Sequence, residues 1–235
     1  MTQAKGIDLS AWNTVTDWAA VGKAGLSFAF IKATEGNGYE ADYKSHWEGA
    51  GSIGLLRSNY HFHRVGVSGA LQADYFLKRA TKGELPPVVD FEDGEGLAQS
   101  HIVGSIMLDS LRACLERIES AWDCLPIVYT GMWFLQACLN ESPNYNPRWL
   151  TKYPLWIAHY THNPDVPPLK PAWWDWKFYQ YTSSGQVPGI TGRVDLNVFA
   201  GTVEELRTWA GIEKPGLTDK QKLDILWADY QAKHG

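Results

Sequence analysis

The sequence predicts an α/β protein: a single irregular (β/α) barrel of eight strands that has fewer than eight helices. Three observations predict this fold. Eight short apolar runs rich in β-branched and aromatic residues recur along the 235 residues, as strands do. Helical patterns separate the early runs, and such alternation is typical of parallel strands. The length suits a single barrel domain.

The expected strands are bounded by glycine, proline or polar residues, which commonly end strands. In chain order they cover residues 6–10, 27–34, 53–62, 87–92, 126–130, 155–160, 177–182 and 194–199. Eight strands favour closure of the sheet into a barrel.

Helices are expected in the early connections, over residues 14–25, 42–51, 68–81 and 99–122, the first with a capping box at Thr14 and Asp17. The later connections differ. Residues 161–176 contain four prolines and residues 183–193 are rich in glycine, so neither segment predicts a crossover helix. We therefore expect helices to be missing in the second half of the barrel.

The chain divides into a barrel over residues 1–212 and a tail over residues 213–235, which we interpret as a linker and a C-terminal amphipathic helix. The barrel part ends in a helical segment around residues 203–210. In the tail, one helix face carries Leu223, Leu226, Trp227 and Tyr230. About 19 residues cannot fold alone. We expect this helix to dock on its own barrel, or otherwise on another subunit or a target.

Charge and composition exclude several classes of partner. The net charge of −5 argues against binding nucleic acid or an anionic membrane through a basic field. No run approaches the roughly 18 apolar residues of a membrane span, so we expect no stable membrane insertion. The three cysteines match neither a zinc pattern nor a disulfide framework and are interpreted as reduced thiols. We expect a monomer.

Acidic residues gather at the ends of the expected strands, where the active sites of α/β barrels lie. They are Asp8, Glu35, Asp90, Glu92 and Asp195. Aromatic, histidine and amide side chains occupy the other strand ends: Tyr60, His61, His63, Tyr129, Tyr160, Gln180 and Tyr181. Twelve tryptophans and eleven tyrosines are many for this length, and surplus aromatic rings often stack on sugars. Carboxylates surrounded by aromatic rings suit a sugar-binding site.

The segment PPVVDFE at residues 86–92 places two carboxylates on one strand face. Side chains two residues apart on a strand point the same way, so Asp90 and Glu92 lie about 6.6 Å apart along the backbone. Repulsion between them, together with desolvation by aromatic rings, raises the pKa of one carboxyl and lets it donate a proton near neutral pH. Glycoside hydrolysis needs this combination of an acid and an anion.

Each acid also has a structural interpretation: Asp8 could cap a helix, Glu35 could pair with Lys32, and Asp195 could be a turn residue. A second alternative is a Mg²⁺ or Mn²⁺ site with one of the strand-end histidines as an extra ligand, but no metal-motif spacing is present. The sequence also lacks a Gly-rich phosphate loop and a GxSxG elbow, which disfavours phosphoryl transfer and serine hydrolysis. The joint placement of the acids at strand ends favours the glycosidase.

Seven sequence blocks in the same order resemble those of the glycoside hydrolase family 25 lysozymes, also called Chalaropsis-type muramidases. The blocks are GIDLSAW at 6–12, FAFIKATEG at 28–36, NYHF at 59–62, PPVVDFE at 86–92, PIVYT at 126–130, PLWIAHY at 154–160 and QYTSSGQVPGITGRVDLNVF at 180–199. Seven ordered blocks are far more specific than any one motif. The C-terminal helix lies outside this resemblance.

The resemblance implies cleavage of the β-1,4 bond between N-acetylmuramic acid and N-acetylglucosamine in peptidoglycan. It implies Glu92 as the general acid and Asp90 as a nucleophile or as the residue that orients the substrate's acetamido group. Asp8 and Asp195 map to supporting acids. The expected substrate-binding residues are Glu35, Tyr60, His61, Tyr129, Trp156, Tyr160, Gln180 and Tyr181. No cofactor and no metal are implied.

The N-terminal segment MTQAKGIDLS shows no apolar core of a secretory signal. We therefore expect a phage endolysin that is made in the host cytoplasm and acts on the cell wall after release; a secreted bacterial lysozyme is the alternative. Two other functions remain open, a hydrolase of another amino sugar polymer such as chitin and a non-catalytic wall-binding barrel. The complete acidic set argues against the non-catalytic barrel.

Overall fold

The computed structural model describes residues 2–92, 104–140 and 142–212, together with Leu223, Trp227 and Gln231. Of the tail over residues 213–235, in which a C-terminal amphipathic helix was expected, the structure describes Leu223, Trp227 and Gln231, which are helical; Leu223 is 68% and Trp227 61% exposed. The rest of the tail and the first residues of the helix expected over 99–122 lie outside the described residues. Docking of the tail therefore stays a prediction.

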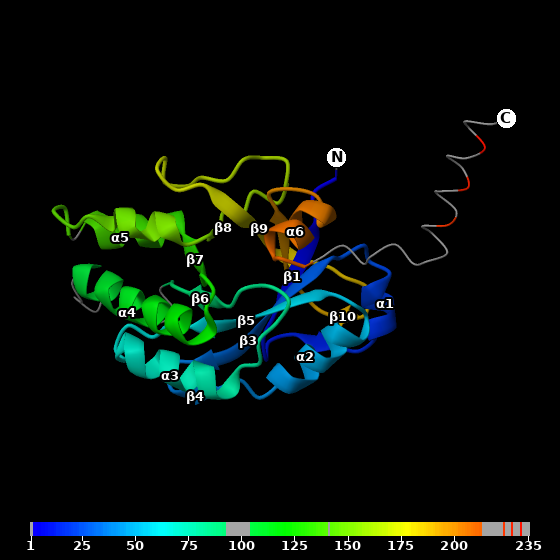
Figure 1. Cartoon of the computed structure of the whole chain (residues 1–235), viewed down its shortest axis with the longest axis horizontal. Helices are drawn as coiled ribbons and strands as arrows, with labels where there is room; N and C mark the ends of the chain where they lie inside the picture. Colours follow the sequence, from blue (N-terminus) through cyan, green and yellow to red (C-terminus); the bar gives the residue numbers. More distant parts are fainter. Residues whose placement is uncertain are drawn as a thin grey trace.

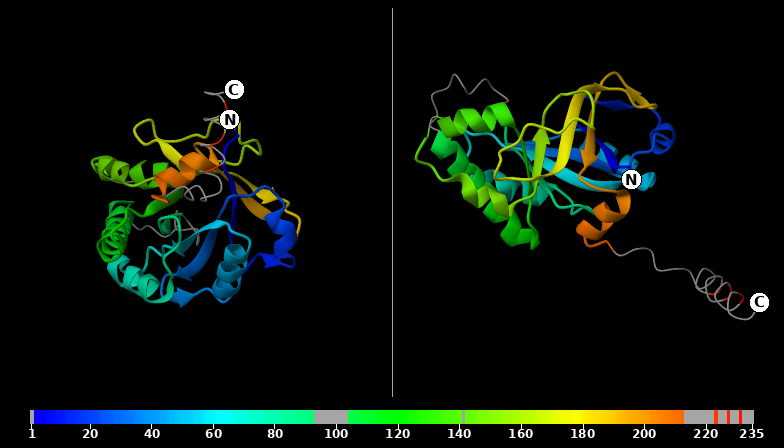
Figure 2. Two further views of the ribbon diagram at one scale, coloured as in Figure 1. Left: turned by 45° about the vertical axis from the view of Figure 1, so that its right-hand side comes forward. Right: turned by 90° about the horizontal axis from the view of Figure 1, so that it is seen from above.

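All eight predicted strands are present and close into a barrel (Figures 1 and 2). Around the barrel the order is β1 (Lys5–Leu9), β11 (Val194–Phe199), β9 (Trp176–Gly185), β8 (Leu155–Ala158), β7 (Ile127–Gly131), β6 (Val88–Asp90), β5 (Leu56–Phe62) and β3 (Phe28–Glu35). Pairing of β1 with β3 closes the ring. The predicted fold class is confirmed.

The parallel arrangement expected from strand and helix alternation fails at one strand. Neighbouring strands from β1 through β9 are parallel, but β11 runs antiparallel to both β9 and β1. The reason is the short connection of residues 186–193, because parallel strands need a crossover of a dozen or more residues. The start of β11 consequently lies at the end of the barrel where the other strands finish.

Helices surround the first strands of the barrel and are sparse later (Figure 1). They are α1 (Trp18–Gly22), α2 (Tyr43–Ser52), α3 (Gly69–Arg79), α4 (Gly104–Trp122), α5 (Met132–Asn140), a 3₁₀ helix at Pro147–Lys152, and α6 (Val203–Trp209). No helix follows β8 or β9 before the next barrel strand, as predicted. The sequence did not predict α5 or the 3₁₀ helix. No helix in the described part of the chain is long and apolar enough to cross a bilayer.

Several sequence-based boundaries were wrong, and the capping box expected at Thr14 and Asp17 is replaced by a cap at Asp17 alone. Thr14 and Val15 form the short strand β2, which pairs with β10 (Ile190–Thr191), because β-branched residues favour extended backbone. Helix α1 begins only at Trp18, capped by the Asp17 side chain, which accepts from the Ala20 N–H at 3.1 Å.

Strand β6 ends at Asp90, so Glu92 follows the strand instead of belonging to it. A further short strand, β4 (Gly38–Tyr39), pairs with the end of β3.

The barrel interior is filled by aromatic rings below the strand ends. Phe30 contacts Trp156 across the barrel with ring centroids 4.2 Å apart, and Phe178 packs edge-on against Phe28 and Phe30. A second core cluster packs the helices against the outer face of the sheet. The three cysteines are free thiols. This filled interior supports the polar layer above it, where the candidate site lies.

Candidate active site

A cavity of about 230 Å³ opens at the end of the barrel where the parallel strands finish. Its lining combines four carboxylates with aromatic rings, one lysine and one amide. The residues are Asp8, Ser10, Trp12, Lys32, Tyr60, Phe62, Asp90, Glu92, Tyr129, Trp156, Tyr160, Gln180 and Asp195. All four predicted catalytic acids are therefore brought together in one cavity.

Strand alternation explains how the chain builds this lining. Successive side chains point to opposite faces of a strand. On β3, Phe28 and Phe30 fill the barrel interior, so Lys32 comes next on the same face and reaches the cavity. The same parity places Asp90 above Val88 on β6, and Gln180 above Phe178 on β9. These three strands thus contribute apolar residues to the interior and one polar residue each to the site.

Asp8 lies at the centre of a buried hydrogen-bond network. Its Oδ2 accepts from Gln180 Nε2 at 2.9 Å and from Asn197 Nδ2 at 2.8 Å. The Asn197 side-chain oxygen accepts from Trp156 Nε1 at 2.9 Å. Gln180 Oε1 accepts from the hydroxyls of two lining tyrosines, Tyr129 at 2.8 Å and Tyr160 at 3.0 Å. These bonds fix Asp8 and orient the five other residues of the network.

The carboxylates raise one another's pKa values inside the barrel. Burial, followed by the charge of Asp195, raises the pKa of Asp8 well above its usual value. Burial, followed by the charge of Glu92, raises the pKa of Asp90 in the same way. Burial raises the pKa of Asp195 to about 6. Oδ1 of Asp90 is buried and has no hydrogen-bond partner in the described part of the chain. The cluster therefore retains protons to higher pH than isolated carboxyls do.

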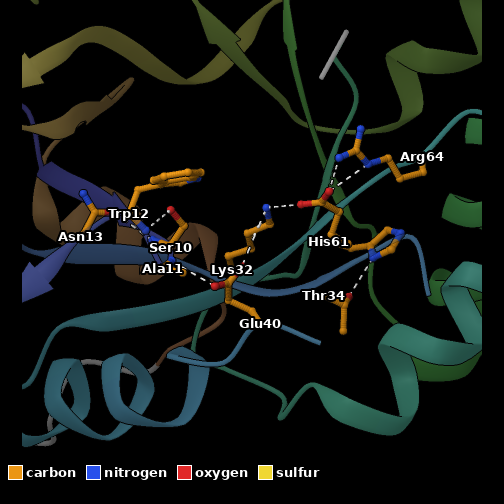
Figure 3. A network of polar contacts seen from close by, with 10 residues as sticks. Ser10, Ala11, Trp12, Asn13, Lys32, Thr34, Glu40, His61 and Arg64 are labelled. Carbon is orange, nitrogen blue, oxygen red and sulfur yellow. Dashed lines mark hydrogen bonds and ion pairs between the residues drawn. The ribbon is translucent and has the colours of Figure 1, made fainter. Parts of the chain in front are cut away.

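Lys32 is the cation of the cavity lining (Figure 3). Its Nζ lies 2.5 Å from Glu35 Oε2 and 3.8 Å from Glu40 Oε2, and over the ring of Phe62. Glu35 also binds Arg64. The charge of Lys32 lowers the pKa of Asp90 and so partly opposes the effect of burial. A buried cation thus tunes the acidic cluster and is itself held by two glutamates.

The loop after β1 presents a tryptophan at the edge of the cavity. Trp12 is 92% exposed although it lines the cavity. Its loop is fixed, because the Ala11 N–H donates to Glu40 Oε1 at 3.0 Å and the Ser10 N–H donates to Asn13 Oδ1 at 2.9 Å (Figure 3). An exposed indole on a rigid loop beside carboxylates is a ready surface for stacking on a sugar ring.

Three predicted substrate-binding residues do not line this cavity. His61 lies on the opposite face of β5 from Tyr60, where Thr34 and Gln72 hold its ring at 2.8 and 2.9 Å. Burial lowers the pKa of His61 to about 4, so its ring is neutral at pH 7. Tyr181 lies on the opposite face of β9 from Gln180 and packs against the outer core. Glu35 lies between Lys32 and Arg64, which bears out its pairing with Lys32.

Sequence reasoning missed five residues that the structure places at the site. Ser10, Trp12 and Lys32 line the cavity. Phe62 lies beneath Lys32, and Asn197 holds Asp8. Strand parity was the signal for Lys32 and Phe62, since they fall two residues from Phe30 and Tyr60. Asn197 falls two residues from Asp195 on β11. No sequence signal distinguishes Trp12 from a buried tryptophan.

The arrangement suits proton transfer between carboxyls and a substrate. Asp90 and Glu92 share a cavity, and the charge of Glu92 acts on Asp90 directly. The aromatic rings around them offer apolar faces. Within residues 2–92, 104–140 and 142–212, no group of three or more histidine, cysteine or acidic side chains is placed to hold a metal ion. Paired carboxyls with distinct environments are the machinery of glycoside hydrolysis.

Comparison with known proteins gives consistent matches. The model of the glycosyl hydrolases family 25 matches residues 7–190. Protein YegX of Escherichia coli K12 is 36% identical over 87% of this chain and 72% of its own length. Lysozyme M1 of Streptomyces globisporus is 32% identical over 86% of this chain and 69% of its own length. The crystal structure of a bacterial lysozyme from Streptomyces coelicolor superposes with a TM-score of 0.79 at 29% identity, covering 90% of this chain and 99% of that one.

Proposed function

The chain belongs to glycosyl hydrolase family 25 and is a glycoside hydrolase of the lysozyme type; we propose that it cleaves the β-1,4 bond between N-acetylmuramic acid and N-acetylglucosamine in peptidoglycan, with Glu92 as the general acid. The observation that carries this proposal is the cavity in which Asp8, Asp90, Glu92 and Asp195 meet. Relatives named lysozyme support the choice of substrate.

The proposed division of labour follows from the environments of the two central acids. Glu92 lies just beyond β6 and is half-buried, so it can reach a bridging oxygen from the edge of the cavity. Asp90 is buried below it, beside Lys32 in the lining. Because the charge of Glu92 raises the pKa of Asp90, the pair as a unit holds a proton to higher pH than one carboxyl would. That proton is available for the leaving oxygen.

In the proposed reaction Glu92 donates its proton to the bridging oxygen as the bond from that oxygen to the anomeric carbon breaks. Asp90 stabilises the positive charge that develops at the anomeric carbon, either by direct attack or by orienting the substrate's acetamido oxygen for attack. Water then adds to the anomeric carbon as its bond to Asp90 or to the acetamido oxygen breaks, and Glu92 takes up a proton from that water. Asp8 and Asp195 adjust the charge of the cavity around the reacting bond and do not transfer the proton themselves.

The test compares wild-type protein with Glu92→Gln on purified bacterial walls, followed by turbidity and by mass analysis of the released fragments. The amide keeps the shape of the side chain but cannot donate the proton, so activity should fall by about 10²-fold or more. Glu48→Gln is a matched control, because Glu48 is an exposed glutamate on α2. Circular dichroism checks that each variant is folded.

Three results would overturn the proposal. A Glu92→Gln variant with wild-type turnover would remove Glu92 from the chemistry. Wild-type protein that leaves walls intact but degrades chitin would make it a hydrolase of another amino sugar polymer. Wild-type protein that binds walls and cleaves neither polymer would make it a non-catalytic barrel. The expected role in phage-induced lysis stays a prediction of the sequence.

A further inference from the structure

A second cavity, of about 420 Å³, adjoins the acidic one and shares two lining residues with it, Glu92 and Tyr160. Its remaining lining comes from the end of β7, the first turns of α5, the end of β8 and the loop that follows β8. Those residues are Gly131, Met132, Trp133, Gln136, Ala158, His159 and Leu169. The two cavities therefore form one continuous surface with Glu92 at their junction.

The second cavity differs from the first in chemistry. Among the lining residues that the structure describes, Glu92 is the one carboxylate, and none is a lysine or an arginine. Trp133 is 60% exposed and Leu169 is 62% exposed, so most of each side chain lies outside the core. Exposed apolar side chains that gather at a cavity indicate a binding surface. The surface suits an uncharged ligand with an apolar face.

The apolar surface is held in place by its neighbours. The Trp133 indole lies over Gly131, where an added Cβ would come within 3.0 Å of its Nε1, so glycine permits this close approach. The same indole packs edge-on against buried Phe134, with ring centroids 5.7 Å apart. On the facing side, the Leu169 N–H donates to His159 Nδ1 at 3.2 Å. The cavity is thus preformed on both sides.

The position of Glu92 decides which part of a substrate this surface meets. A general acid lies beside the bridging oxygen, which joins two sugars. The first sugar carries the anomeric carbon that is attacked, and the second departs with the bridging oxygen. The first of these sugars lies with Asp90, Asp8 and Asp195 in the acidic cavity. The leaving sugar must then extend past Glu92 on its other side, where the apolar cavity begins.

We propose that the cavity lined by Trp133, Tyr160 and Leu169 binds the leaving-side N-acetylglucosamine, with the sugar ring on the Trp133 indole. This inference rests on the proposed muramidase function and names the site of its second sugar. N-acetylglucosamine is uncharged, and its ring face and acetamido methyl group match an apolar lining. Gln136 and His159 supply polar groups for its hydroxyls.

The methionine methyl groups give a direct test of binding. The chain has three methionines, of which Met132 lines the cavity and Met107 is buried elsewhere. Titration of protein carrying ¹³C-methyl methionine with N-acetylglucosamine should shift the Met132 resonance, assigned with Met132→Leu, and leave that of Met107 unchanged. The shift should disappear in Trp133→Ala. It should persist in Leu71→Ala, because Leu71 is an exposed leucine on α3 outside both cavities.

Activity gives the second readout. Loss of the stacking surface should lower kcat/KM of Trp133→Ala on isolated glycan strands by about tenfold, without a change in the pH profile. Any one of three results would overturn the inference. The Met132 resonance could stay unchanged when N-acetylglucosamine is added, its shift could persist in Trp133→Ala, or Trp133→Ala could keep the wild-type kcat/KM. These failures are distinct from failure of the proposed function, which would appear as wild-type protein that does not digest walls.

Discussion

Asp8 at the end of β1 is the register partner of Asp195 at the start of β11. This juxtaposition exists because β11 runs antiparallel to β1, which carries the beginning of a strand to the end of the barrel where the other acids lie. The charge of Asp195 is the second cause, after burial, of the raised pKa of Asp8. The two carboxyls are therefore held together at a cost in stability when both are ionised.

The first prediction concerns that cost. Burial raises the pKa of folded Asp195 to about 6, whereas an unfolded Asp titrates near 3.9. As the pH rises from about 4 to 6 the unfolded state ionises first, so the folded state loses stability across this window. Asp195→Asn should consequently be more stable than wild type at pH 7, by about 1–3 kcal/mol, and no more stable at pH 3.

Urea unfolding at the two pH values measures this difference, and wall digestion should show reduced turnover in the same variant. A lower urea midpoint for Asp195→Asn at pH 7 would mean that the Asp195 carboxylate stabilises the fold. Full activity of Asp195→Asn and of Asp8→Asn would leave both acids with structural roles only.

The second prediction concerns Lys32. Its charge opposes burial and the charges of Glu92, Asp8 and Glu35, all of which raise the pKa of Asp90. Lys32→Met should therefore raise the pKa of Asp90 further and move the acid limb of the kcat/KM profile to higher pH. Lys32→Arg keeps the charge and is the control. An unmoved acid limb in a folded Lys32→Met variant would exclude this electrostatic role.

The third prediction separates two interpretations of Glu35. Burial alone would raise the pKa of Glu35, but hydrogen bonds from Lys32 and Arg64 outweigh it and lower the pKa below its usual value. Glu35 therefore stabilises the fold above the pKa of an unfolded glutamate, and this stability is lost as the pH falls through the lower folded pKa. Glu35→Gln should be less stable than wild type at pH 7, by up to about 1 kcal/mol because solvent screens these partly exposed ion pairs, with the difference shrinking below pH 4.

Thermal or urea unfolding across pH 3–7 tests the stability of Glu35→Gln, and wall-digestion kinetics test the original expectation of substrate binding. A variant with normal stability and a raised KM would restore Glu35 to the substrate-binding set.

Strand parity explains how far the sequence could predict this site. The acids at positions 8, 90 and 92 were predicted because they lie near the carboxyl ends of apolar runs, and Asp195 because it lies near the start of the last run; the structure gathers all four in one cavity. Parity also excludes His61 from the cavity once Tyr60 lines it, since adjacent residues on β5 face opposite ways. The antiparallel direction of β11 follows from the short connection of residues 186–193 and was not evident from the apolar runs alone.

Other features depend on contacts between distant segments, which a single sequence does not show. The helix over Met132–Asn140 is apolar nearly throughout, so its sequence does not show the alternation of apolar and polar residues that indicates a helix. The exposure of Trp12 follows from a loop fixed by Glu40, a residue 29 positions away from Ala11. The pairing of Lys32 with Glu40 likewise depends on the turn between β3 and β4, which folds the chain back along β3 and so places Glu40 near Lys32.

The fourth prediction tests Trp12 as a sugar platform. Because the indole is almost fully exposed, Trp12→Ala should change the free energy of unfolding by no more than about 0.5 kcal/mol. It should lower kcat/KM on glycan strands by about tenfold, and Trp12→Phe should recover part of that loss because a ring remains. Tyr39→Ala, another exposed aromatic, is the control. Equal losses in the Ala and Phe variants would argue against stacking.

The identity of the new reducing end tests the central claim most directly. Purified walls are digested with the wild-type protein, the products are reduced with borohydride and hydrolysed, and the sugar alcohols are quantified. If N-acetylmuramic acid occupies the acidic cavity over Asp90 while Glu92 protonates the bridging oxygen, the digest should yield muramicitol and little glucosaminitol. Predominant glucosaminitol would make the protein a glucosaminidase and contradict the proposed placement of the substrate.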